Sequence, residues 1–179
     1  MIDKTWTLFL DRDGVINRRI VDDYVKKWED FEFLPGVPEA IRDLSMIFNH
    51  ILIVSNQQGI GKGLMTKEDL KAVHEAMTGA IRKAGGRIDG IYHCPDLAAT
   101  GSFLRKPAVG MGLRARREFP DISFRKSLMA GDSVSDMIFG KRLGMKTVFL
   151  CDDLRKARQM PRVIDFVLPD LPALAAALK

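Results

Sequence analysis

Short apolar runs alternate along this chain with segments that have the spacing of amphipathic helices. Such runs are typical of strands buried on both faces, and their alternation with helices predicts an α/β fold around a mostly parallel sheet. The predicted strands are residues 5–10, 51–54, 88–92, 127–130, 147–150 and 163–168. Helices are expected at 37–48, from a capping box at Thr66 and Asp69 to Gly85, from near Pro107, at 135–143 and from Leu171.

The length and composition favour one soluble domain. A chain of 179 residues that is 46% hydrophobic is near the usual domain size and can bury one core, so we expect a single domain over residues 1–179 and a monomer. No apolar run approaches the roughly 18 to 20 residues of a membrane span, and the N-terminus lacks the layout of a secretion signal. We therefore expect a cytoplasmic protein that does not bind a membrane.

The cysteines and the charge exclude further classes of protein. Cys94 and Cys151 are too few for a disulfide framework, and neither has a partner at zinc-ligand spacing. The net charge of +5 comes from scattered pairs such as Arg18-Arg19 and Lys141-Arg142. Such pairs are typical of a solvated surface, so nucleic acid is disfavoured as a partner, whereas the cations could attract a small anionic substrate.

The first cluster of reactive residues, Asp11-Arg12-Asp13-Gly14, follows the first predicted strand. In doubly wound sheets, ligands bind where strands release the chain at their carboxyl ends. Two acids one residue apart, followed by a glycine that permits a tight turn, can place one carboxylate at a metal and direct the other toward a leaving group. An isolated Asp-x-Asp is weak evidence, because it is usually a solvated turn.

Two further clusters contain groups that bind phosphate. Ser55-Asn56-Gln57 follows the second strand, and the glycine-rich segment 58–63, with Lys62, could bring backbone N–H groups close to an anion. This segment lacks the spacing of a nucleoside triphosphate loop. Arg105 and Lys106 precede a predicted helix start. Lys106 could neutralise a phosphoryl group, and Arg105 could bind a second phosphate or a hydroxyl.

The fourth cluster, residues 131–136, follows another strand and contributes Asp132 and Asp136. The two acids are four residues apart, so a helical turn would place them on one face. Carboxylates of Asp11 and Asp132, with a backbone carbonyl and water, suit Mg²⁺ better than zinc. Each cluster alone is ambiguous, but together they supply a nucleophile, an acid, a phosphate clamp and metal ligands.

These four clusters, in this order, resemble the motifs of the haloacid dehalogenase superfamily of phosphatases over nearly the whole chain. The resemblance implies a Rossmann-like three-layer sandwich and hydrolysis through an aspartyl-phosphate, with Asp11 as the nucleophile and Asp13 as the general acid and base. It also implies Mg²⁺ held by Asp11, the Asp13 carbonyl and Asp132, with Asp136 nearby. Ser55 and Lys106 would bind the phosphoryl group, and Asn56, Gln57, Lys62 and Arg105 would contribute to phosphate or substrate binding.

The intervals between motifs leave little room for a cap domain. Among capless members, the chain is similar to the branch of the heptose bisphosphate and histidinol-phosphate phosphatases, through Asp11 to Asn17, Ser55-Asn56-Gln57 and Arg105-Lys106-Pro107. The resemblance implies a small sugar phosphate such as a heptose 1,7-bisphosphate as substrate. That branch typically has a zinc loop of three cysteines and a histidine, of which only Cys94 remains, and Asp96 stands at the expected histidine. We therefore expect no structural zinc.

Three alternatives stay open from the sequence. Histidinol phosphate is one other substrate, and a 3′-phosphorylated polynucleotide is another, since such phosphatases share an Asn-Gln-x-Gly-Ile loop and an Arg-Lys-Pro motif. A non-catalytic phosphate-binding scaffold is the third, and the intact Asp11 and Asp13 argue against it.

Overall fold

The computed structural model describes residues 2–153, 155, 157, 159 and 162–179. Within these residues, six strands form one parallel sheet in the order β3-β2-β1-β4-β5-β6. This is the order of a doubly wound Rossmann-like sheet, so the predicted fold class is confirmed. The strands are β1 (Thr7–Leu10), β2 (His50–Asn56), β3 (Gly90–Cys94), β4 (Ser127–Gly131), β5 (Lys146–Leu150) and β6 (Phe166–Leu168).

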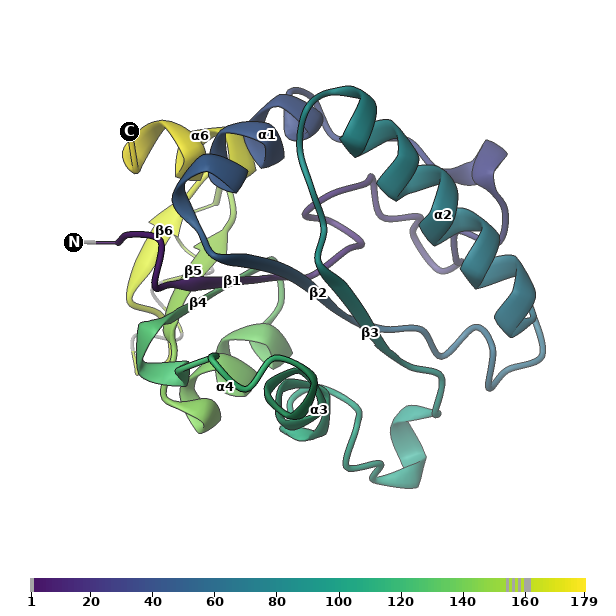
Figure 1. The fold of residues 1–179 in the computed structure, drawn as a ribbon. Coiled ribbons are helices and arrows are strands. Elements are labelled where there is room, and N and C mark those ends of the chain that lie inside the picture. The colour runs from purple at the N-terminus through teal and green to yellow at the C-terminus, as the bar shows by residue number, and fades with distance from the viewer. Residues whose placement is uncertain (1, 154, 156, 158, 160–161) are drawn as a thin grey trace.

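Helices cover both faces of the sheet, as Figure 1 shows. On one face, α1, α2 and α6 pack against residues such as Leu8 and Ile53, and on the other, α3 and α4 pack against Phe9 and Leu52. The opposite faces of the strands are therefore both buried, which explains their continuous apolar runs. The helices are α1 (Val37–Ile47), α2 (Lys67–Lys83), α3 (Gly110–Glu118), α4 (Val134–Leu143) and α6 (Leu171–Ala177).

The strand order reverses between β1 and β4. The chain runs from β1 outward through β2 to β3 and then returns to β4 on the other side of β1. Leu10 pairs with Ala130 in the register of these two strands, and the Asp11 N–H donates to the Ala130 carbonyl at 3.1 Å. The residues after both strands therefore leave the sheet at one level, beside the crevice where such folds bind ligands.

Several element boundaries differ from the sequence-based expectation: β1 begins at Thr7, β3 is shifted to Gly90–Cys94, and β2 extends to Asn56 and so includes Ser55. The helix expected from near Pro107 begins at Gly110, because the N–H groups of Ala108 and Gly110 donate back to the carbonyls of Arg105 and Phe103 in turns. The last strand begins at Phe166 rather than near 163. The capping box of α2 is confirmed, with the Thr66 side chain accepting from the Asp69 N–H.

A flap, residues 17–33, lies between β1 and α1 and is pinned at both ends. Asn17 forms isolated bridges with Asp13 and Phe33, and Trp28–Asp30 forms a short 3-10 helix in which Trp28 stacks on Phe31 at 4.9 Å. Among the described residues there is no helix with the length and apolar character that a bilayer crossing requires.

Candidate active site

Asp11 directly follows β1, where the strand order of the sheet reverses. It is buried, with 6% of its surface exposed. Its Oδ1 accepts from the Arg12 N–H at 2.7 Å and lies 2.9 Å from the Lys106 ammonium. Burial raises the pKa of the Asp11 carboxyl to about 7, the Lys106 charge opposes this rise, and Asp136 and Asp132 add to it. A further cation beside Asp11 would stabilise the ionised carboxylate that a nucleophile needs.

Lys106 is a buried cation held by both its side chain and its backbone. Its Nζ lies 2.6 Å from Asp136 Oδ1 and donates to the Val54 carbonyl at 2.6 Å. The Asn56 amide makes two hydrogen bonds of 3.0 Å with the Lys106 backbone, one to its N–H and one to its carbonyl. Asn56, predicted to bind substrate, thus fixes the position of Lys106 and also lines the pocket described below.

The Asp13 side chain turns toward a polar network beside the acidic residues. The Arg12 guanidinium donates to both Asp13 oxygens at 2.8 and 2.9 Å, and Asn17 and Gln57 add hydrogen bonds of 3.0 and 2.8 Å. Burial raises the pKa of Asp13, but the Arg12 charge and these hydrogen bonds outweigh it and lower the pKa below its usual value. Asp13 is therefore ionised near neutral pH when no substrate is bound.

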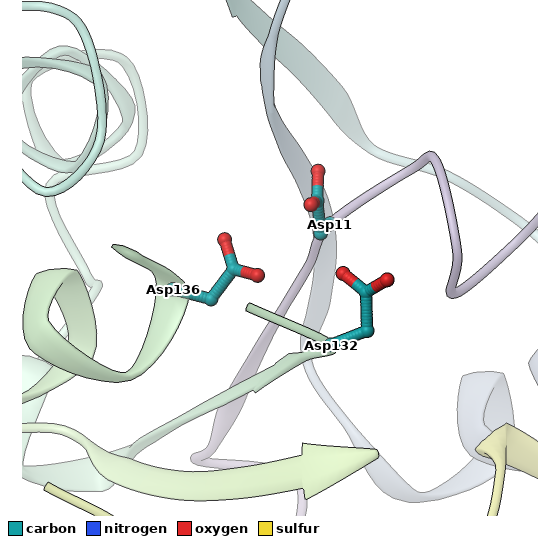
Figure 2. Close-up of side chains that lie close together, drawn as sticks. All are labelled: Asp11, Asp132 and Asp136. Carbon is teal, nitrogen blue, oxygen red and sulfur yellow. The ribbon is translucent and has the colours of Figure 1, made fainter. Parts of the chain in front are cut away.

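Three carboxylates meet at the carboxyl ends of β1 and β4. Asp11, Asp132 and Asp136 each offer an oxygen, and these atoms lie within 4.8 Å of one another. Figure 2 shows their side chains converging from the end of β1, the end of β4 and the start of α4. Burial raises the pKa of Asp132 to about 6, which the Arg19 charge opposes. Closely spaced anionic oxygens of this kind suit a hard divalent cation.

Local structure around the acidic cluster depends on a glycine and a helix cap. Gly14 has a φ of +91°, and a Cβ there would overlap the Asp132 carboxylate, so only glycine fits this turn. Asp136 belongs to the capping box of α4, where its Oδ2 accepts from the Ser133 N–H at 3.0 Å and from the Ser133 hydroxyl at 2.6 Å. The start of α4 therefore holds Asp136 against Lys106.

Arg19, on the flap, makes contacts that the sequence did not indicate. One nitrogen, Nη2, donates to the Asp13 carbonyl at 2.9 Å and to Asp132 Oδ1 at 2.8 Å. About half of its side chain is exposed. In the sequence it was one of many basic pairs, and no local pattern relates residue 19 to residue 132.

A pocket of about 250 Å³ opens above these residues. Asp11, Asp13, Ser55 and Lys106 line its polar base, and Arg19 and Arg105 add positive charge. Tyr24 and Val25 of the flap contribute an aromatic and an apolar surface to the pocket. The sequence did not indicate these two contacts. The size of the pocket and its three cations, Lys106, Arg19 and Arg105, suit a small phosphorylated molecule.

Two predicted binding residues lie outside the pocket lining. Gln57 is buried, and its amide bridges Asp13 and the Ser55 hydroxyl, both at 2.8 Å, so it orients pocket residues. Lys62 is exposed, with its ammonium 5.4 Å from the centre of the Tyr24 ring. Its role in substrate binding stays a prediction.

Comparisons with known proteins agree with this site. The model of the HAD-hydrolase-like family matches residues 103–174. The chain is 42% identical over 132 residues to the D-glycero-alpha-D-manno-heptose-1,7-bisphosphate 7-phosphatase of Mycobacterium bovis, covering 74% of this chain and 70% of the relative. It is also 42% identical to the enzyme of that name from Campylobacter jejuni, over 86% of each chain. The chain belongs to the haloacid dehalogenase-like phosphatases.

A solved structure of this family has the same architecture. The D,D-heptose 1,7-bisphosphate phosphatase from B. bronchiseptica, complexed with magnesium and phosphate, superimposes with a TM-score of 0.87 at 30% identity over 97% of both chains. The agreement over nearly the full length confirms the expected superfamily. It also confirms that the protein is an enzyme that hydrolyses phosphate esters.

Proposed function

We propose that this phosphatase hydrolyses a small sugar phosphate, a D-glycero-D-manno-heptose 1,7-bisphosphate, with Mg²⁺ and through a phosphoryl group carried on Asp11. The observation that carries the proposal is the buried contact between Asp11 and Lys106, 2.9 Å apart, beside Asp132 and in a pocket that also contains two arginines. This arrangement presents a carboxylate to a phosphate and supplies positive charge where negative charge develops.

The proposed reaction has two displacements at phosphorus. In the first, an Asp11 oxygen forms a bond to phosphorus, the ester P–O bond breaks, and Asp13 gives its proton to the leaving oxygen. In the second, Asp13 takes a proton from a water molecule that attacks the same phosphorus, so inorganic phosphate leaves and Asp11 is regenerated. Lys106 and the Ser55 hydroxyl hold the phosphoryl oxygens in both steps.

Asp13 must be protonated before the first displacement, whereas Arg12 keeps it ionised in the free protein. A bound phosphate brings negative charge into the pocket next to Asp13, and a nearby like charge raises a carboxyl pKa. Substrate binding therefore favours the protonated acid, and the departure of the leaving group favours the base. Arg12, Asn17 and Gln57 keep the side chain oriented in both states.

Asp11, Asp132 and the carbonyl of Asp13 are the proposed ligands of Mg²⁺. The fit rests on hard oxygen atoms that already converge, and on the pKa values of about 7 and 6 for Asp11 and Asp132, which a nearby cation would lower. Asp136 has both oxygens engaged, by Lys106 and by the cap of α4, so we assign it to charge balance and to positioning Lys106. When bound, the ion would supply charge neutralisation for the transferring phosphoryl group.

The substrate proposal rests on the relatives and on the pocket. The relatives from Mycobacterium bovis and Campylobacter jejuni, each at 42% identity, are named for the heptose bisphosphate, and their name specifies a 7-phosphatase. The pocket contains two arginines besides Lys106, which suits a substrate with a second phosphate. We accordingly expect a small cytoplasmic metabolite rather than a polymer as the partner.

The test is phosphate release from four substrates under one set of conditions with Mg²⁺. The two anomers of D-glycero-D-manno-heptose 1,7-bisphosphate are compared with histidinol phosphate and a 3′-phosphorylated oligonucleotide. We expect kcat/KM for one heptose anomer to exceed that for the other two substrates at least about a hundredfold, since contacts to a second phosphate add binding energy. Preferential turnover of histidinol phosphate or of the oligonucleotide would contradict the substrate proposal.

A further inference from the structure

Arg19 binds two oxygens that the proposed function assigns to the metal. Its Nη2 atom lies 2.9 Å from the Asp13 carbonyl and 2.8 Å from Asp132 Oδ1, so one nitrogen bridges them. These atoms come from the loop after β1 and the end of β4, which Arg19 therefore links directly. The bridge differs from a usual surface ion pair, in which the cation contacts one carboxylate at the rim.

The bridge and a bound Mg²⁺ would compete for the same oxygens. Arg19 donates to the Asp13 carbonyl and to Asp132 Oδ1, the two oxygens that the proposed site also assigns to the ion. Two cations sharing these oxygens would also repel each other. Binding of the ion at the Asp13 carbonyl and Asp132 therefore disfavours the Arg19 bridge.

The local charge supports an exchange. Asp11, Asp132 and Asp136 bring three carboxylates together, and Lys106 compensates for one of them through contacts with Asp11 and Asp136. Arg19 supplies a second positive charge through Asp132. Lys106 and Arg19 balance two of the three carboxylates, whereas Lys106 and a divalent ion would balance all three, so replacing the guanidinium by the ion completes the neutralisation.

Arg19 can leave without disturbing the core. Its side chain is 51% exposed, and it lines the solvent-facing pocket. The neighbouring Arg18 anchors the flap separately, through two hydrogen bonds to Glu32 of 2.9 and 3.0 Å, and its N–H donates to the Glu32 carbonyl. Rotation of the Arg19 side chain therefore leaves the backbone of the flap in place.

We propose that the Arg19 guanidinium occupies the cation site of the metal-free enzyme and is displaced when the divalent ion binds. The inference rests on the proposed metal site, because it assigns Asp132 and the Asp13 carbonyl to both cations. Arg19 thereby acts as an internal competitor that holds the ligands together and sets how tightly the enzyme binds Mg²⁺.

The first test is Mg²⁺ affinity, measured by calorimetric titration of EDTA-treated, dialysed protein. Arg19→Ala removes the competitor, so we expect it to bind Mg²⁺ about three- to tenfold more tightly than the parent. Arg18→Ala removes the same charge from the adjacent position and should leave the affinity within about twofold. Unchanged or weaker binding by Arg19→Ala, or equal tightening in both variants, would overturn the exchange.

The second test is thermal unfolding of the same proteins in EDTA and in saturating Mg²⁺. Arg19→Ala should unfold at a lower temperature than the parent in EDTA and at the same temperature in Mg²⁺, because only the metal-free form uses the bridge. An equal decrease in both conditions would contradict displacement. Asp132→Asn tests the underlying site separately: if it binds Mg²⁺ as tightly as the parent, the metal assignment fails, and the exchange fails with it.

Discussion

At the scale of single residues, the most unusual feature is a fully buried arginine beside the reactive carboxylates. Arg12 contacts Asp13 on one side, and its Nη1 lies 3.2 Å from His74 Nε2. An arginine stays protonated and only donates, so His74 Nε2 must accept, with the imidazole neutral and its proton on Nδ1. Burial, the Arg12 charge and the nearby His93 together lower the pKa of His74 to about 3, against the opposing effect of Asp13.

This buried histidine should contribute to acid sensitivity. Between pH about 6.5, the usual pKa, and about 3, the unfolded chain binds a proton at residue 74 that the folded protein does not. The contribution of His74 to stability is therefore complete above about pH 6.5 and is lost as the pH falls. Between pH 7.5 and pH 5, we expect the free energy of unfolding to fall by about 2 kcal/mol less in His74→Gln than in the parent. The glutamine keeps an acceptor for Arg12. Urea unfolding at both pH values measures this, and parallel losses would refute it.

The proposed role of Asp11 as the nucleophile is tested by the substitution Asp11→Asn. The substitution keeps the size of the side chain and removes its nucleophilic charge, so we expect activity below about 1% of the parent with an unchanged circular dichroism spectrum. A variant that folds and keeps more activity than this would contradict the role of Asp11. Asp152→Asn, the same change at an exposed residue outside the pocket lining, is a control for the effects of substitution itself.

The sequence indicated the side chains that converge in the site better than the residues that orient them. Asp11 and Asp132 directly follow apolar strands and Ser55 lies near the end of one, and nearness to a strand end is visible in a linear pattern. The contacts of Arg12 with His74, and of Arg19 with Asp132, join residues 62 and 113 positions apart. Such pairings depend on how α2 and the flap pack, and no local spacing encodes that.

At the scale of elements, helix starts with local hydrogen bonds were predictable, and starts fixed by distant contacts were not. Thr66 and Asp69 form a capping box within four residues, so α2 begins where the sequence indicates. The segment after Lys106 depends on Asn56, 50 positions away, whose amide holds the Lys106 backbone. After Lys106 the backbone N–H groups of Ala108 and Gly110 donate back to Arg105 and Phe103, and the expected helix begins later, at Gly110.

The cap of α2 offers a stability test outside the pocket lining. Thr66→Ala removes the hydroxyl that accepts from the Asp69 N–H, which should lower the free energy of unfolding by about 1 kcal/mol. Urea unfolding measures the change, and kcat should remain within about twofold of the parent. Thr66→Ser keeps the hydroxyl and should lose much less. Equal losses for both substitutions would show that the cap does not explain the effect.

At the scale of the whole molecule, the reversal of strand order brings the four motifs together. β1 and β4 are neighbours although more than a hundred residues separate them, so Asp11 and Asp132 meet at one edge of the sheet. The alternation of strands and helices predicted this class of fold, and the resemblance gave the order of the motifs. The path of the flap over the pocket was not predictable, because it has little regular structure.

The whole enzyme should depend on one kind of metal ion. We expect EDTA to abolish phosphate release and added Mg²⁺ to restore at least about 80% of it, because Asp11 and Asp132 need a cation to hold their charges together. Activity that persists in EDTA would contradict the magnesium proposal. We also expect elemental analysis of the purified protein to find less than about 0.1 zinc per chain, and stoichiometric zinc would contradict this second expectation.

The loop after β3 is held by contacts among its own side chains and backbone. The buried Cys94 thiol lies 3.6 Å from Asp96 and 3.8 Å from the Ser102 hydroxyl, and Arg105 donates to the Asp96 carbonyl. We expect these contacts to hold the corner without a coordinated ion. A chelator should then act on catalysis without dismantling the scaffold, and the polypeptide should refold from denaturant in EDTA before any ion is supplied.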